Sequence, residues 1–217
     1  MVRIAGYAAI AALAGGLAAC ATPQPPLSPV LTYARTNCHA SPDLSSAIGL
    51  TPEKEKNGHV VTTLIGSDTP CLMTSGGAAP YVIYALPDDI GDKTLAVGGV
   101  LEPARILSPD VSILDAQGGV TRTFAPADYY FRGPVYSVQF RPRAGDAFVL
   151  VASDPSRVGQ QYDAINVGTN TTVVSTGLYA AAITTGHEAR ASRAFSHEGT
   201  IQVIVYDSDT KESPPVR

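Results

Sequence analysis

Short apolar runs separated by turn-forming residues dominate the chain from His59 onward. Within positions 136–140 and 200–206, apolar and polar residues alternate, the period expected of a strand that buries one face. This spacing predicts about nine strands and no long amphipathic helix. The runs concerned are Val60–Ile65, Tyr81–Leu86, Thr94–Leu101, Val111–Leu114, Val120–Phe124, Tyr136–Phe140, Ala147–Val151, Thr171–Thr176, Leu178–Thr185 and Thr200–Tyr206.

These strands predict an all-β fold, a single antiparallel β-sandwich of the immunoglobulin-like or jelly-roll-like kind over residues 59–207, with an open barrel as the alternative. The turn at 115–119 predicts a hairpin between the runs on either side of it. The continuously apolar run Ala147–Val151 predicts a central strand, and Gly98-Gly99 indicates a bulge.

Residues 20–58 are expected to form a separate N-terminal part. Four prolines in 21–30 favour an extended spacer, and Ser41–Ile48 predicts a short helix with Ser41 as its N-cap. The charged stretch 51–58 is expected to be a solvated connection, and 208–217 a polar, frayed tail.

The first 20 residues carry a single charge, Arg3, and an apolar run that is too short for a stable membrane span. The run ends in Leu17-Ala18-Ala19-Cys20, which resembles the bacterial lipobox, so 1–19 is predicted to be a signal peptide and Cys20 the lipidated first residue. An ordinary cleaved signal that leaves a free thiol at Cys20 is the alternative. Ala21 after the cysteine favours the outer membrane, with the protein anchored by lipid and facing the periplasm.

Lipidation of Cys20 leaves Cys38 and Cys71 as a pair in an oxidising compartment, where a disulfide is expected. Loop entropy for about 33 enclosed residues contributes roughly 3 to 4 kcal/mol. Cys38-His39 lacks the further ligands that a zinc site requires, so no metal is predicted.

The formal net charge is −4, and the sequence has no cluster of lysine and arginine that could bind the phosphates of a nucleic acid. Nucleic acid is therefore not an expected partner. No cofactor motif is present either. Ser75 lacks the frame of a nucleophile elbow, and His187-Glu188 and His197-Glu198 do not form a zinc-protease helix, so the two histidines are expected to be solvated.

The acidic stretch 87–93 has the composition of a surface loop rather than of a glycosidase site. Together these patterns predict that the protein is not an enzyme.

One aromatic cluster stands out as a candidate ligand site. Its residues are Asp128, Tyr129, Tyr130, Arg132 and Tyr136. Aromatic rings stack on sugar faces while acidic and basic groups bind hydroxyls, which favours a carbohydrate surface. Because consecutive strand residues point to opposite faces, part of this set is expected to be core packing.

The central third of the chain resembles a known family. The segments that carry the resemblance are Tyr81–Pro87, Arg105–Asp115, Thr123-Phe124, Tyr129–Phe131 and Phe148–Val151, which together resemble the maltose-operon periplasmic protein family over about residues 81–168. The resemblance implies an envelope protein of carbohydrate uptake and provides no catalytic residues.

The sequence therefore predicts a non-enzymatic outer-membrane lipoprotein that serves as an accessory or binding module in carbohydrate uptake. A structural or assembly lipoprotein that docks a protein partner of the envelope is the alternative, and a hydrolase is the least favoured.

Overall fold

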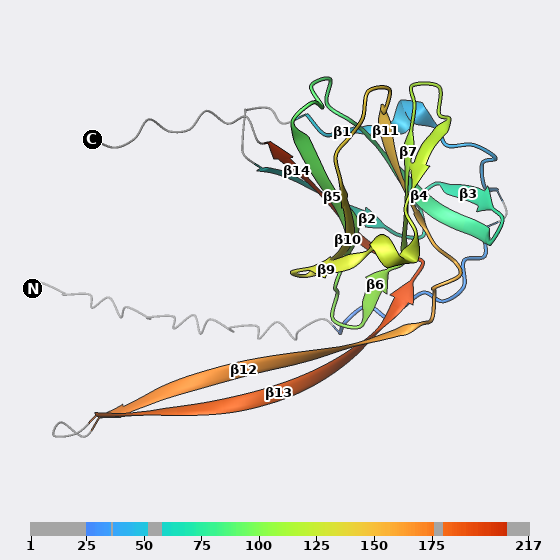
Figure 1. The fold of residues 1–217 in the computed structure, drawn as a ribbon. Coiled ribbons are helices and arrows are strands. Elements are labelled where there is room, and N and C mark those ends of the chain that lie inside the picture. Colours follow the sequence, from blue (N-terminus) through green and yellow to red (C-terminus); the bar gives the residue numbers. More distant parts are fainter. Residues whose placement is uncertain (1–24, 36, 52–57, 176–179, 208–217) are drawn as a thin grey trace, which may run out of the picture.

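The strands of the protein fall into three sheets (Figure 1). The structure is a computed structural model and describes residues 25–35, 37–51, 58–175 and 180–207. Within these ranges there are fourteen strands and two 3₁₀ turns, and no α-helix. The described part of the chain is therefore mostly β-strand.

The first sheet has the strand order β1-β4-β11-β7-β8, and β3 pairs with β4 outside this path. Its strands are β1 (Ile48–Gly49), β3 (Cys71–Thr74), β4 (Gly77–Ala85), β7 (Pro109–Leu114), β8 (Val120–Thr123) and β11 (Phe148–Ser153). The predicted central strand is confirmed, because β11 lies between β4 and β7. The predicted hairpin is β7–β8, and its turn is held by the Asp115 carboxylate, which accepts hydrogen bonds from the N–H groups of Gln117 and Gly119.

The second sheet has the order β2-β14-β5-β10-β9. Its strands are β2 (Gly58–Ile65), β5 (Lys93–Val100), β9 (Tyr130–Arg132), β10 (Val135–Phe140) and β14 (Gly199–Asp207). The alternation predicted for 200–206 is confirmed, since Ile201, Val203 and Val205 are buried along β14.

Apolar side chains from the two larger sheets form one hydrophobic core. Val111, Val149 and Val151 of the first sheet belong to the same buried cluster as Val97 and Val203 of the second. Burying a valine-sized side chain contributes about 1.5 to 3 kcal/mol, so this shared cluster is the main force that holds the sheets together.

The third sheet contains β6 (Arg105–Leu107), β12 (Gln161–Ser175) and β13 (Ala180–Ser196). β12 and β13 form one long antiparallel hairpin, which extends away from the two packed sheets (Figure 1). We call this hairpin the arm. The strands predicted at 171–176 and 178–185 are confirmed at the described positions 171–175 and 180–185, but they are only the outer part of two much longer strands. Residues 176–179 lie outside the described residues.

A single antiparallel sandwich is too simple a description of this architecture. The described strands form three sheets, and two of the pairings, β1 with β4 and β6 with β13, are parallel. The predicted helix at Ser41–Ile48 is also wrong. Only a 3₁₀ turn, Leu44–Ser46, forms there, its N-cap is Asp43 rather than Ser41, and Ile48 already belongs to β1.

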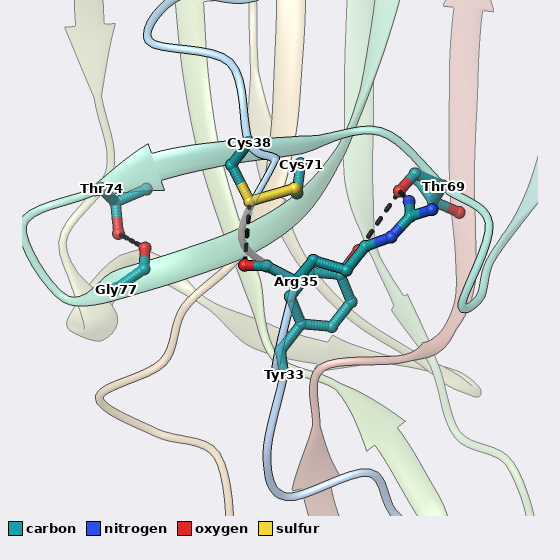
Figure 2. Close-up of a disulfide and its surroundings, with 7 residues drawn as sticks. All are labelled: Tyr33, Arg35, Cys38, Thr69, Cys71, Thr74 and Gly77. Carbon is teal, nitrogen blue, oxygen red and sulfur yellow. Dashed lines mark hydrogen bonds between the residues drawn. A yellow bond between two sulfur atoms is a disulfide. The ribbon is translucent and has the colours of Figure 1, made fainter.

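The N-terminal segment is fastened to the body at several points. Val30 lies against the root of the arm, just after the last residue of β13. Its carbonyl accepts a hydrogen bond from the His197 N–H at 3.0 Å. Further along, Tyr33 and Arg35 both donate to the Thr69 carbonyl, at 3.2 and 2.9 Å (Figure 2).

The predicted disulfide between Cys38 and Cys71 is confirmed and joins this segment to the start of β3 (Figure 2). The N-terminal segment is thus fixed on the body at Val30, Tyr33, Arg35 and Cys38. The connection expected at 51–58 and the tail from residue 208 lie largely outside the described residues.

Gly98 and Gly99 do not form a bulge, because β5 keeps a continuous register with both β10 and β14 there. Both glycines instead allow the backbone of a neighbouring segment to lie close to β5. A Cβ at Gly98 would collide with the carbonyl oxygen of Tyr136, and one at Gly99 would lie 2.6 Å from the carbonyl oxygen of Leu107. Glycine is required at both positions because backbone occupies the space of a side chain.

Gly98→Ala is therefore expected to destabilise the protein by about 1 to 3 kcal/mol, since the added methyl group must displace backbone in the core. Gly91→Ala is the matched control, because nothing lies within 4 Å of its Cβ position. Urea unfolding followed by circular dichroism measures both. Equal stability of the two variants would contradict this account of the glycine pair.

Candidate functional site

The structure divides the five predicted ligand residues into a buried pair and an accessible set. Tyr129 and Tyr136 belong to the core, with exposed fractions of 7% and 6%. Their rings stack with centroids 5.4 Å apart, and the Tyr129 hydroxyl accepts a hydrogen bond from the Val111 N–H at 2.9 Å. Burial raises the pKa of Tyr129 well above its usual range. These two tyrosines pack between β7, β9 and β10 and belong to the core.

The other three residues, Asp128, Tyr130 and Arg132, line a surface groove of about 680 Å³. Tyr130 is the most exposed of them, at 61%. Because Tyr130 follows Tyr129 on the chain, the strand alternation that buries Tyr129 turns Tyr130 outward. We call this site the β8–β10 groove. The residues that line it are Arg122, Thr123, Phe124, Asp128, Tyr130, Arg132, Val138, Gln139, Phe140, Arg141, Pro142 and Arg143.

Arginine dominates the charge of the groove. Four arginines, at positions 122, 132, 141 and 143, line it together with a single carboxylate, Asp128. The Asp128 carboxylate accepts a hydrogen bond from the Ala125 N–H at 2.8 Å, which fixes the turn before β9. The site is therefore positively charged on a protein whose formal net charge is −4.

Arg122 is held rigidly in the groove wall. Its guanidinium lies 5.5 and 5.0 Å from the ring centroids of Phe124 and Phe140, and it forms an ion pair with Asp146 at 3.2 Å. Burial lowers the pKa of Arg122, and the Asp146 carboxylate opposes this effect. The Nε of Arg122 is buried and has no hydrogen-bond acceptor among the described residues.

Arg132 lies across the groove next to the exposed tyrosine. Its guanidinium is 5.6 Å from the Tyr130 ring centroid and donates a hydrogen bond to the Ser137 carbonyl. An arginine fixed in this way presents its remaining N–H donors in a defined plane, which suits a carboxylate or a phosphate. The groove thus offers an aromatic face next to planar cationic donors.

Sequence reasoning missed Arg122, Arg141 and Arg143. Arg122 comes from β8 of the first sheet, and the other two come from the loop after β10 of the second. Only the packing of the two sheets brings all three into one groove with Tyr130. The one available signal was the pair of arginines around Pro142, just after a strand with one solvated face.

The residues considered for hydrolysis lie apart from one another. Ser75 lies in the turn between β3 and β4, whereas His187 pairs with Gly168 in the arm. His197 is not solvated, contrary to the sequence-based prediction. It is 6% exposed, and its Nδ1 lies 2.8 Å from the hydroxyl of buried Ser153.

The acidic stretch 87–93 has a structural role. Lys93 is 5% exposed and its ammonium forms ion pairs with Asp89, Asp92 and Asp207 at 3.1, 3.0 and 3.0 Å. Burial lowers the pKa of Lys93, but these carboxylates outweigh that effect and raise it above its usual range. The aspartates neutralise a buried cation where β5 and β14 meet.

In the part of the chain that the structure describes, no three His, Cys, Asp or Glu side chains gather closely enough to hold a metal ion. The described residues also contain no helix with the length and apolar character needed to cross a membrane.

No protein-family model matches the chain, and no curated protein matches it. The resemblance to the maltose-operon periplasmic protein family therefore stays a prediction.

Buried His197 makes stability depend on pH. Burial lowers the pKa of His197 below 6.5, so the folded protein binds this proton less readily than the unfolded chain does. The stability that it contributes is complete above pH 6.5 and is lost as the pH falls toward the folded-state pKa. Urea titrations at pH 8, 6 and 5 should show this loss, and His197→Asn should flatten it. The same slope in both proteins would contradict the assignment.

Proposed function

We propose that the protein is a lipid-anchored, non-enzymatic binding module of the outer membrane that faces the periplasm and serves carbohydrate uptake, and that its ligand is a saccharide bearing carboxylate or phosphate groups. The β8–β10 groove is the observation that carries this proposal. It joins an exposed tyrosine ring to four arginines, the two features that an acidic sugar requires.

The two features bind different parts of such a ligand. Tyr130 presents a flat apolar face on which the C–H groups of a pyranose ring pack. The arginines bind the acidic group, and a charge-assisted hydrogen bond of this kind contributes about 1.5 to 3 kcal/mol. A neutral maltodextrin would use only the ring and would bring no anionic group to the guanidinium groups. The positive charge therefore favours the acidic saccharide.

Calorimetric titration with a hexamer of galacturonic acid, with peptidoglycan fragments and with uncharged maltohexaose tests the groove. We expect an acidic saccharide to bind more tightly than maltohexaose, and its affinity to fall with added salt. Tyr130→Ala and Arg143→Ala should each weaken binding about tenfold, or about 1.4 kcal/mol.

Tyr206→Ala is the matched control, because Tyr206 is 42% exposed on β14 and does not line the groove. Absence of heat with every acidic saccharide, or equal loss with the control, would refute the proposal.

The anchor has a separate test in Cys20. Membrane fractionation should recover the wild-type protein with the outer membrane, and mass spectrometry of its N-terminal peptide should show acyl chains on Cys20. Cys20→Ser should shift the protein into the soluble fraction, because two or three acyl chains supply most of the membrane affinity. An unmodified Cys20 in the membrane fraction would rule out lipid anchoring.

A further inference from the structure

The arm is an extended element with little support from the rest of the molecule. β12 and β13 pair over fifteen rows, from Gln161 opposite Ala194 to Ser175 opposite Ala180. At about 3.3 Å per residue the arm is about 50 Å long. The arm is attached to the body at its root. Residues 194–196 of β13 pair in parallel with β6, the Arg193 guanidinium donates to the Glu102 carbonyl at 2.7 Å, and the Tyr162 ring of β12 stacks on Phe131. The rest of the hairpin projects from the two packed sheets (Figure 1).

A free two-stranded hairpin leaves half of its backbone groups without strand partners. β12 is the outer strand of the β12-β13-β6 sheet, and within the described residues no strand pairs with its other side. Along that edge, every second residue directs its N–H and C=O away from β13. Two strands alone are marginally stable in water, whereas three or more are stable. The arm therefore gains most from an additional strand along β12.

The sequence of the arm lacks the usual protection against such pairing. Edge strands of soluble proteins normally carry lysine, proline or inward-pointing charge. Residues 164–186 contain no Asp, Glu, Lys, Arg, His or Pro. Asp163 is the single charged residue of β12, and the other charges of the arm lie on β13, in the half of the arm nearer its root.

We propose that the free edge of β12 pairs antiparallel with the same edge of a second copy of this chain, so that two arms form one four-stranded sheet in a symmetric dimer. A two-fold axis near Gly168 pairs all fifteen residues of β12 with their counterparts. In that register Asp163 faces Val173 of the other copy, and no like charges meet. The two-fold symmetry makes the interface self-complementary, since each copy supplies the same edge.

The size of this contact matches that of a stable interface. Fifteen antiparallel residues form about 14 to 16 backbone hydrogen bonds, compared with about 10 direct hydrogen bonds in a typical protein interface. The free edge of β13 suits pairing less well. It carries Glu188, Arg190 and Arg193, and β6 already occupies it at residues 194–196.

A cross-strand pair in the arm provides matched variants. Thr171 of β12 and Thr184 of β13 lie opposite each other, and their hydroxyls hydrogen-bond at 3.0 Å. Thr171→Lys and Thr184→Lys both remove this hydrogen bond and both add one positive charge. Only Thr171→Lys places the charge on the edge proposed to pair. A further variant, Thr169→Lys/Thr171→Lys, gathers four lysines around the two-fold axis of the dimer.

The experiment is sedimentation equilibrium of the full-length chain in density-matched detergent, at concentrations from about 1 to 100 μM. We expect the wild type to be a dimer and Thr184→Lys to remain one. Thr171→Lys should raise the dimer dissociation constant at least tenfold, and the double variant should be a monomer. Circular dichroism verifies that each variant is folded.

Hydrogen exchange provides an independent measurement. Amides in alternate residues of β12 should exchange more slowly as the protein concentration rises, and they should lose this protection in the double variant. A wild type that is monomeric at 100 μM, equal weakening by the two single variants, or exchange in β12 that does not depend on concentration would each overturn the proposal.

Discussion

The insertion of β14 between β2 and β5 is the constraint on which the rest of the structure depends. β14 pairs with β2 over Gly199–Tyr206 and with β5 over Ile201–Asp207, and its buried residues Ile201, Val203 and Val205 belong to the shared core. The second sheet is incomplete until this last strand enters, since β2 and β5 have no direct pairing. The strand pairs of this sheet that involve β14 join parts of the chain that are more than 100 residues apart. Folds that depend on such long-range pairing generally fold slowly. The buried Lys93 and its aspartates secure the place where β14 ends beside β5.

The two proposed surfaces both follow from this arrangement. β5 separates β14 from β10, and β10 together with β9 and β8 carries the arginine groove. The arm directly precedes β14 in the chain, so its root lies where the last strand begins, beside Val30 of the N-terminal segment. The groove and the arm are built from different strands. Loss of ligand binding and loss of self-association would therefore be separate defects.

Several elements were predictable because their causes are local. The β7–β8 hairpin depends on a turn that Asp115 and Gly118 can form by themselves, and Gly118 has a φ of 84°, which favours glycine. The burial of β14 follows from strict alternation. The sequence-based prediction failed where the conformation or burial of a residue depends on another residue that is distant in the chain. Gly98 was taken for a bulge because a sequence cannot show that the Tyr136 backbone lies against it, and His197 was expected to be solvated because Ser153 is distant in the chain.

The sequence by itself determined the β-rich character of the domain, the pairing of Cys38 with Cys71 and the candidate residues Tyr130 and Arg132. The strands and the candidate residues follow from local sequence patterns. The disulfide follows from the cysteine count, because only two cysteines remain once Cys20 is assigned to lipid. Only the tertiary structure decided that Tyr129 and Tyr136 are core, that Arg122 and Arg143 line one groove with Tyr130, and that β12 and β13 form one projecting hairpin. The physical reason is that strand order is set by burial and backbone pairing between remote segments, and no local pattern records which strands become neighbours.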